Sequence, residues 1–203
     1  KGKVTTDKLL NIKNKELEDF TRNLKKHKVI EAKFIQETYR KLRKKTKKTT
    51  GNAIFVDGSK FRWVVDGSSP VEWIFDGSSL VSFHPKEKYA TRYPSKGSQG
   101  KEFRQVVEMI TDMKKLREKY ELVYSYKKGN KGTLKLVPFS GKVLSDIEKI
   151  EIQLNFSKYY INGLKIFFKH GNYSHFTFLK PRFSTSKKGA FDLPKGVEIV
   201  DAL

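Results

Sequence analysis

A threefold Asp-Gly-Ser repeat limits what this chain can fold into more than any other feature. It occurs at residues 57–59, 66–68 and 76–78, each time directly after an apolar residue. Asp-Gly tolerates the positive φ angles of tight turns, so Asp-Gly between alternating apolar runs predicts β-hairpins. The repeat therefore predicts an antiparallel meander of three or four strands between residues 53 and 84.

The meander carries much aromatic and aliphatic surface on one face. Phe61, Trp63 and Val65 share one face of a strand, and Val71, Trp73 and Phe75 share one face of the next. Such a face needs either a core or an apolar guest to cover it. Alternation alone favours packing in a core, with a ligand cavity as the alternative.

Two segments have the periodicity of amphipathic helices. In residues 7–26 and again in 101–119, apolar side chains recur at roughly helical spacing. Residues 29–35 alternate like a strand, whereas 37–48 also fit a helix by propensity, and we expect a loop at 85–100. Further strands are predicted from alternation at 122–126, 134–138, 150–156, 164–168, 176–178 and 197–200.

These elements add up to about ten strands in hairpin order and two helices. A chain of this kind builds a mainly β (α+β) fold, in which an antiparallel sheet curls into an open or closed barrel. The two amphipathic helices then cover a face or the mouth of the sheet.

The charge of the chain is strongly positive. Lys and Arg number 43 against 22 Asp and Glu, which gives a formal net charge of +21 and predicts attraction to nucleic acid, lipid head groups or acidic proteins. The densest basic stretch, residues 40–48, is interpreted as an exposed hairpin connection. A phosphate-tracking contact is the alternative. We favour the former because lysine is spread over the whole chain and no motif of paired stacking aromatics is present.

Little in the sequence indicates catalysis. The absence of cysteine excludes disulfides, thiolate metal sites and a cysteine nucleophile. The four histidines are scattered without metal-ligand spacing, and no Gly-x-Ser-x-Gly nucleophile motif occurs. Residues 97–101 lack the length of a phosphate-binding loop. We therefore expect no enzyme, no catalytic residue, no metal and no cofactor.

The sequence has no apolar run approaching the roughly 18 residues of a membrane span. It opens Lys1-Gly2-Lys3, without the apolar core of a signal peptide. Either a signal peptide never existed or it has been removed.

Several blocks, in order along residues 7–201, resemble the bacterial outer-membrane lipoprotein carrier (LolA-like) family. They are similar to the family's "F-x-Q" strand, its Phe-x-Trp strand, its "DG-K-x-L-W-x-Y-x-P" segment, its "L-x-L-x-P" strand and its terminal "F-x-x-P-x-G-V". The matching blocks are 34–36, 51–56 with 61–63, 70–85, 134–138 and 191–197.

One family feature is replaced in this chain. Members often have Arg-Pro before the Phe-x-Trp strand, and in the best-known ones that arginine helps hold a helical lid over the cavity. Asp57 and Gly58 stand at those positions here. Arg62 is the candidate substitute.

The resemblance implies a single domain over 1–203, an incomplete β-barrel of about ten or eleven strands with the helices as a lid over an apolar cavity. It also implies a monomeric periplasmic carrier, its signal peptide removed, that binds lipoprotein acyl chains. Such a carrier takes its cargo from an inner-membrane ABC transporter and passes it to an outer-membrane acceptor. Its charge predicts transient membrane-surface contact, and we expect no nucleic-acid partner.

The alternatives are a same-fold carrier of another envelope lipid or glycolipid, and a basic module that binds nucleic acid or anionic surfaces.

Burial of acyl chains is physically necessary for such a carrier. A chain of about sixteen carbons exposed to water costs on the order of 13 kcal/mol at ~0.8 kcal/mol per methylene. The cavity candidates are Phe34, Ile54, Phe61, Trp63, Val65, Val71, Trp73, Phe75 and Leu80, with Ile152, Leu154, Ile166 and Phe178 as weaker ones. The lid candidates are Leu17, Phe20, Leu24, Phe103, Val106, Val107, Ile110 and Met113.

Overall fold

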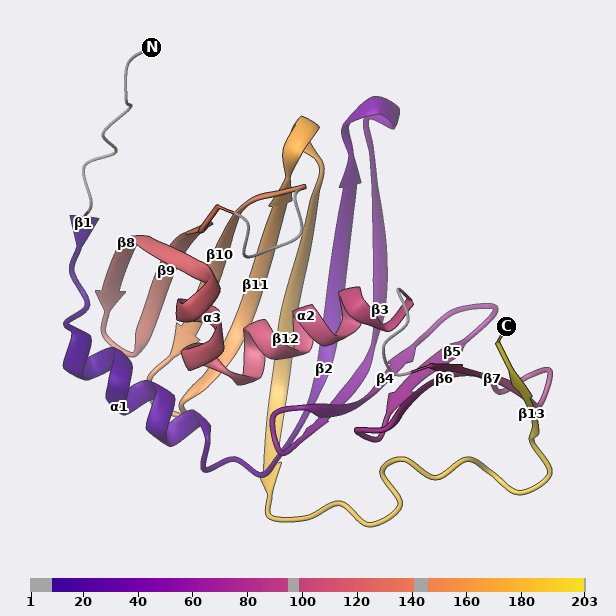
Figure 1. Ribbon diagram of the computed structural model, residues 1–203. Coiled ribbons are helices and arrows are strands. Elements are labelled where there is room, and N and C mark those ends of the chain that lie inside the picture. Colours follow the sequence, from indigo (N-terminus) through magenta and orange to yellow (C-terminus); the bar gives the residue numbers. More distant parts are fainter. Residues whose placement is uncertain (1–8, 95–98, 141–145, 203) are drawn as a thin grey trace.

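The computed structural model describes residues 9–94, 99–140 and 146–202 (Figure 1). The first part of the chain holds β1 (Leu9–Leu10), α1 (Asn14–Leu24), β2 (Val29–Arg40), a 3-10 turn (Lys41–Arg43), β3 (Lys45–Val56), β4 (Lys60–Val65), β5 (Val71–Phe75), β6 (Ser79–His84) and β7 (Tyr89–Pro94). The second holds α2 (Gln99–Thr111), α3 (Met113–Lys119), β8 (Tyr120–Lys128), β9 (Lys131–Pro138), β10 (Ile147–Asn155), β11 (Tyr160–Phe168), a 3-10 turn (Lys169–Gly171), β12 (Tyr173–Ser184) and β13 (Glu198–Asp201).

Within these residues, thirteen strands form one sheet in the order β1-β8-β9-β10-β11-β12-β2-β3-β4-β5-β6-β7-β13. The pairings are antiparallel except at the two edges, where β1 pairs with β8 and β13 with β7 in parallel. The sheet curls without closing, and the three helices lie across one face of it (Figure 1). The predicted mainly β, incomplete barrel with covering helices is confirmed.

The Asp-Gly-Ser repeat forms the turns of the meander β3–β4–β5–β6, as predicted. Asp57 and Gly58 both have positive φ angles, 50° and 69°. In the last turn the Asp76 carboxylate accepts hydrogen bonds from the backbone N–H groups of Ser78 and Ser79 at 2.7 and 3.0 Å. Burial raises the pKa of Asp76, but these hydrogen bonds outweigh it and hold the pKa below its ordinary value.

Both predicted helices exist, with different boundaries. The first is α1, shorter than the predicted 7–26 and preceded by β1. The second is two helices, because the chain breaks at Asp112 between α2 and α3. The Asp112 carboxylate caps α3 by accepting from the N–H groups of Lys114 and Lys115 at 3.1 and 3.2 Å. Periodicity missed the break because the apolar stripe continues through it.

Other boundaries also differ from the predictions. Residues 37–48 are not helical apart from the 3-10 turn, since β2 runs to Arg40 and β3 begins at Lys45. The stretch 40–48 is therefore only in part a connection. The predicted loop 85–100 is wrong at residues 89–94, which form β7 and pair with β6 along their whole length. Residues 95–98 of that prediction lie outside the described residues.

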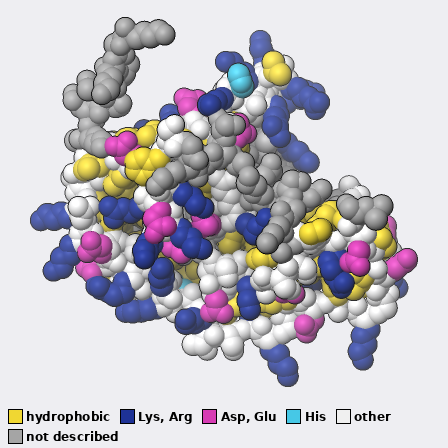
Figure 2. Space-filling model, viewed as in Figure 1, with side chains coloured by type: hydrophobic (Ala, Val, Ile, Leu, Met, Phe, Trp, Pro, Cys, Tyr) yellow, Lys and Arg dark blue, Asp and Glu magenta, His cyan; other side chains and the backbone are white. Residues whose placement is uncertain are grey.

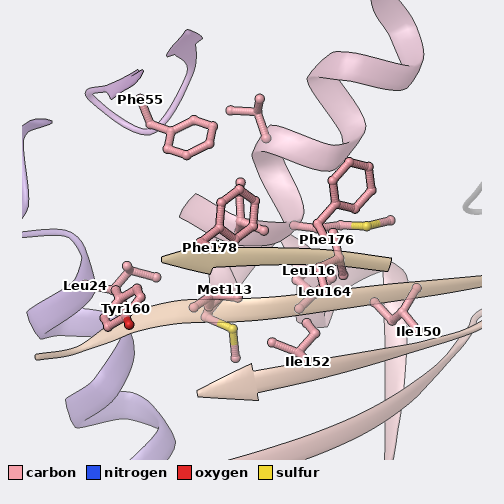
Figure 3. Close-up of a cluster of buried hydrophobic side chains, with 14 of the residues drawn as sticks. Leu24, Phe55, Met113, Leu116, Ile150, Ile152, Tyr160, Leu164, Phe176 and Phe178 are labelled. Carbon is pink, nitrogen blue, oxygen red and sulfur yellow. The ribbon is translucent and has the colours of Figure 1, made fainter. Parts of the chain in front are cut away.

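The main core lies between the helices and the concave face of the sheet. Cross-strand neighbours build it in rows: Ile30, Phe55, Phe61, Phe75 and Leu80 follow one another across β2 to β6 and are all buried. Figure 3 shows side chains of β10, β11 and β12 packed against Met113 and Leu116 of α3.

Helix α1 is fixed to the β8 and β10 side of the sheet by an aromatic contact and an ion pair. The ring of Phe20 packs edge-on against Phe156, with centroids 5.2 Å apart. The Lys127 ammonium lies 2.6 Å from the Glu16 carboxylate and 4.5 Å from the Phe156 ring centroid. The helix thus closes that end of the concave face.

A second, smaller core lies on the convex face of β5 to β7. Ile74, Phe83 and Ala90 are buried there, and Phe191 and Leu193 of the segment before β13 pack against them. The convex face of β5 to β7, which faces away from the helices, is therefore covered as well.

Candidate functional site: the open end of the concave face

A cavity of about 420 Å³ lies between α2 and the hairpin ends of β2, β10, β11 and β12. Its lining contains one set of apolar residues and one set of polar residues. The apolar lining comprises Trp63, Val106, Ile147, Ile166, Phe168 and Phe176. The polar lining comprises Gln36, Thr38, Arg40, Gln105, Asp146, Lys169, His170, Asn172, Tyr173 and Ser174.

The sequence of β2 sets the boundary between core and cavity. Its inward residues are apolar at Ile30, Ala32 and Phe34 and become polar at Gln36 and beyond. The buried part of the strand ends at the same point, because the residues from Ile35 onward are half-buried or exposed. An amphipathic space opens where the apolar inward pattern stops.

Gln105 of α2 and Tyr120 at the start of β8 connect the cavity to the core. Gln105 lines the cavity and donates from Nε2 to the Tyr120 hydroxyl at 3.1 Å. Burial raises the pKa of Tyr120 above its ordinary value, so this hydroxyl is neutral near pH 7. Val106, one residue further along α2, lines the cavity on its apolar side.

Most predicted cavity residues fill the core. Nine of them are at most 8% exposed and belong to one packed cluster: Phe34, Phe61, Trp63, Phe75, Leu80, Ile152, Leu154, Ile166 and Phe178. Of these nine, Trp63 and Ile166 also line the cavity. Val65 and Trp73 are half-buried against the same cluster, and Val71 is half-buried. For the predicted residues that do not line this cavity, a role in ligand binding stays a prediction.

The prediction that Ile54 faces the cavity is wrong. The buried positions of β3 are Gly51, Ala53 and Phe55, so Ile54 points to the opposite, convex face. The prediction placed it inward because both phases of this strand contain apolar residues. Ile54 does not belong to the cavity.

The predicted lid residues whose side chains are described pack against the sheet. Leu17, Phe20 and Leu24 of α1, Val107 and Ile110 of α2 and Met113 of α3 are buried in the main core, and Val106 packs against it. Phe103 falls in α2, but its side chain lies outside the described part of the chain.

The end of α2 is held at the turn where the family has Arg-Pro. The Thr111 hydroxyl, at the end of α2, lies 2.8 Å from the carbonyl oxygen of Gly58 and 2.6 Å from that of Val107. Arg62 does not substitute for the missing arginine. It points to the convex face, where it donates to Glu72 at 2.7 Å and to the carbonyl oxygens of Ala190 and Asp192 at 3.2 Å.

Sequence reasoning missed the polar side of the cavity. Gln36, Thr38 and Arg40 are spaced two apart in continuation of the inward face of β2, and that spacing was the available signal. Ser174 and Asn172 lie near the start of β12, where no pattern marks them.

Two further properties concern the described residues. No group of three or more His, Asp or Glu residues there could hold a metal ion. Nor is any helix in this part of the chain both long and apolar enough to cross a membrane.

Comparison with known proteins agrees with this architecture. A conserved protein from Thermus thermophilus superposes with a TM-score of 0.59 at 10% identity, over 93% of this chain and 98% of that one. MucB superposes with a TM-score of 0.52 at 11% identity, over 94% of this chain and 66% of that one. At these identities the likeness concerns the fold.

No curated protein sequence matches the chain. The family model described as "Outer membrane lipoprotein carrier protein LolA" matches residues 25–193, and the chain therefore belongs to the LolA family.

Proposed function

We propose that this protein is a periplasmic carrier that binds lipoprotein acyl chains beneath α2. The observation that carries the proposal is the cavity at the open end of the concave face, with apolar and polar residues on its lining. Such a space suits an amphiphile, because the chain meets Trp63, Ile166 and Phe176 while its polar end meets Arg40 and Lys169. Membership of the LolA family supports lipoproteins as the source of the chain.

The volume of the cavity limits how much cargo it holds in this conformation. A methylene group occupies about the space of a water molecule, roughly 30 Å³, so a cavity of about 420 Å³ accepts roughly fourteen methylenes. That is one acyl chain. A triacylated cargo therefore requires α2 to move away from the sheet, and the Thr111–Gly58 contact is one that such a movement would break.

The rest of the proposed role needs binding alone. The carrier acts as one domain and as a monomer, without catalysis or cofactor. It receives cargo from an inner-membrane ABC transporter and gives it to an outer-membrane acceptor. Release without ATP is compatible with a cavity that is only partly apolar and opens to solvent.

The test uses the position of the tryptophans. The chain has two, and Trp63 lines the cavity whereas Trp73 does not. In a Trp73→Phe variant, a fatty acid brominated in mid-chain should quench Trp63 fluorescence saturably, because bromine quenches at contact. A triacylated lipopeptide should restore the emission. If the bromine leaves Trp63 emission unchanged, the cavity does not take an acyl chain.

A matched pair of variants locates the ligand. Ser174→Phe should fill the cavity and weaken binding about tenfold or more, since it occupies the space of the chain. Thr177→Phe lies on the same strand with its side chain on the opposite face, so it should leave the affinity unchanged. Equal weakening by both variants would argue against binding at this site.

The room for one chain also favours a second candidate, a carrier of another single-chain envelope lipid or glycolipid. Mass spectrometry of lipid that co-purifies with the protein separates the two. A lipopeptide supports the first role, and a free lipid supports the second.

A further inference from the structure

We propose that the paired tips of the β2–β3 and β11–β12 hairpins dock this protein onto an anionic phospholipid bilayer. The docking surface, called the hairpin-tip surface below, consists of residues 40–48 and 169–172. It lies at the end of the sheet opposite to α1 (Figure 1).

The first supporting observation is unbalanced charge. Residues 38–50 contain seven Lys or Arg and no Asp or Glu, and residues 165–175 contain no acid either. All side chains from Arg40 to Lys48 are exposed. None of the seven cations forms an ion pair with another described residue. Their charge is therefore free to act on an external anion, and a bilayer with anionic head groups presents many anions in one plane.

The second observation is an apolar residue at the outermost point. Leu42 is fully exposed in the 3-10 turn, between Lys41 and Arg43. Figure 2 shows Lys and Arg side chains gathered around a hydrophobic one at this end of the molecule. A single exposed leucine has no meaning by itself. Here, cations on both sides bring it to head-group level, where its side chain enters the interfacial layer.

The third observation is that the two tips are joined. The backbone N–H of Lys41 donates to Asn172 Oδ1 at 2.9 Å. The Lys41 side chain also lies so close over Gly171 that a Cβ there would come within 2.8 Å of Lys41 Cδ. Lys169 and His170, both exposed, therefore belong to the same surface as the β2–β3 tip.

The hairpin-tip surface adjoins the cavity. Arg40, Lys169, His170 and Asn172 belong to both. Docking would thus turn the open end of the cavity toward the bilayer, so that a chain could pass between them with little exposure to water. This consequence rests on the proposed carrier function, whereas the docking itself does not.

A bilayer fits the surface better than a polynucleotide does. Leu42 has no role in tracking phosphates. The nearby aromatic residues Tyr39 and Tyr173 stack on each other, with ring centroids 5.3 Å apart, and so do not form a platform for bases.

The experiment is co-sedimentation of the full chain with two kinds of vesicle: phosphatidylcholine alone, and an equal mixture of phosphatidylcholine and phosphatidylglycerol. We expect binding to the mixed vesicles. Replacement of Lys41, Arg43, Lys44 and Lys45 by Gln should weaken it at least about tenfold. Leu42→Ser should weaken it by about threefold.

The matched control removes four lysines at the opposite end of the sheet: Lys26, Lys128, Lys131 and Lys158, each replaced by Gln. It has the same net charge as the tip variant and should bind the mixed vesicles as the unaltered chain does. Equal loss in both variants, equal binding to both vesicles, or preferential binding to single-stranded polynucleotide would overturn the proposal.

The quenching of Trp63 by a brominated fatty acid keeps this test separate from that of the carrier role. The tip variant leaves the cavity lining intact and should retain quenching. Loss of vesicle binding with quenching preserved supports docking. Vesicle binding that persists in the tip variant refutes docking, whatever happens to the cavity.

Discussion

The two halves of the concave face are built from the same strands, yet one is a packed core and the other contains a cavity. In β2, Phe34 is buried against Trp63 with ring centroids 4.5 Å apart, whereas Thr38, four residues further, lines the cavity. The sheet continues through both halves, so its backbone does not create the cavity. The difference lies in the inward side chains and in where the helices lie.

The closed half has no spare space. A Cβ at Gly51 would come within 2.7 Å of Phe34 Cε1 and 1.8 Å of the carbonyl oxygen of Val64. In the open half the inward positions hold short or polar side chains such as Ser174 and Thr38. A large apolar ligand therefore enters at the open half, and the closed half keeps α2 and α3 in place beside it.

The largest expected effect comes from Phe34→Ala in the closed half. Removal of a fully buried phenyl ring should lower the free energy of unfolding by about 3–5 kcal/mol. Ser174→Ala in the open half should change it by less than about 0.5 kcal/mol. Urea titration measures both. Should Phe34→Ala keep its stability and lose acyl binding instead, the closed half is the cavity and the comparison fails.

Gly51→Ala tests how tightly the closed half is packed. The added methyl group meets backbone and an aromatic ring, so we expect a loss of about 1–3 kcal/mol or more. Gly163→Ala is the control, since its nearest neighbour is the flexible side chain of Gln153 at 3.0 Å. Similar midpoints of thermal unfolding for the two variants would show that the closed half has room.

The contact between the end of α2 and the β3–β4 turn can be removed by Thr111→Val, which keeps the shape of the side chain. The carbonyl oxygen of Gly58 loses a hydrogen bond, which should cost about 1 kcal/mol. If α2 lifts to release cargo, the dissociation rate of a fluorescent fatty acid should rise several-fold. A rate unchanged in stopped-flow measurements would mean that this contact does not control release.

The smallest expected effect concerns α1 and pH. The hydrogen bond from Lys127 is the largest cause that holds the pKa of Glu16 below its ordinary value of 4.5. A carboxyl group with a lowered folded-state pKa stabilises fully above pH 4.5, and the effect is lost as pH falls through the folded value. The pair is partly exposed, so the contribution is a few tenths of a kcal/mol.

The difference in urea midpoint between the unaltered chain and Glu16→Gln checks this. It should be present at neutral pH and shrink as the pH falls below 4.5. Persistence of the difference at low pH would assign the effect to packing.

The fold was predictable where short-range chemistry decides it. The Asp-Gly-Ser turns and the alternation in β8 to β12 predict the meander and the hairpins. Edge strand β1 was not predicted, because it is short and pairs in parallel with distant residues, Leu9 with Tyr124. The helix break at Asp112 was not predicted, because the apolar stripe runs through it.

The site was less predictable for a physical reason. Alternation tells which residues face inward and says nothing about whether a helix or a ligand fills the space opposite. Phe178 and Ile166 are both inward-facing and apolar, yet only Ile166 borders the cavity. That distinction depends on where α2 lies, which no local pattern of β11 or β12 encodes.

The central pairing of the sheet has a consequence for the synthesis of the protein. β2 pairs with β12 across more than 130 residues of sequence. A chain that emerges from its N-terminus can complete the meander β2–β7 early, while one edge of β2 waits for residues 173–184. During that interval an aromatic-rich face and an unpaired edge are both open to other chains. The seam that borders the cavity thus closes late, and long-range pairing of this kind favours slow folding.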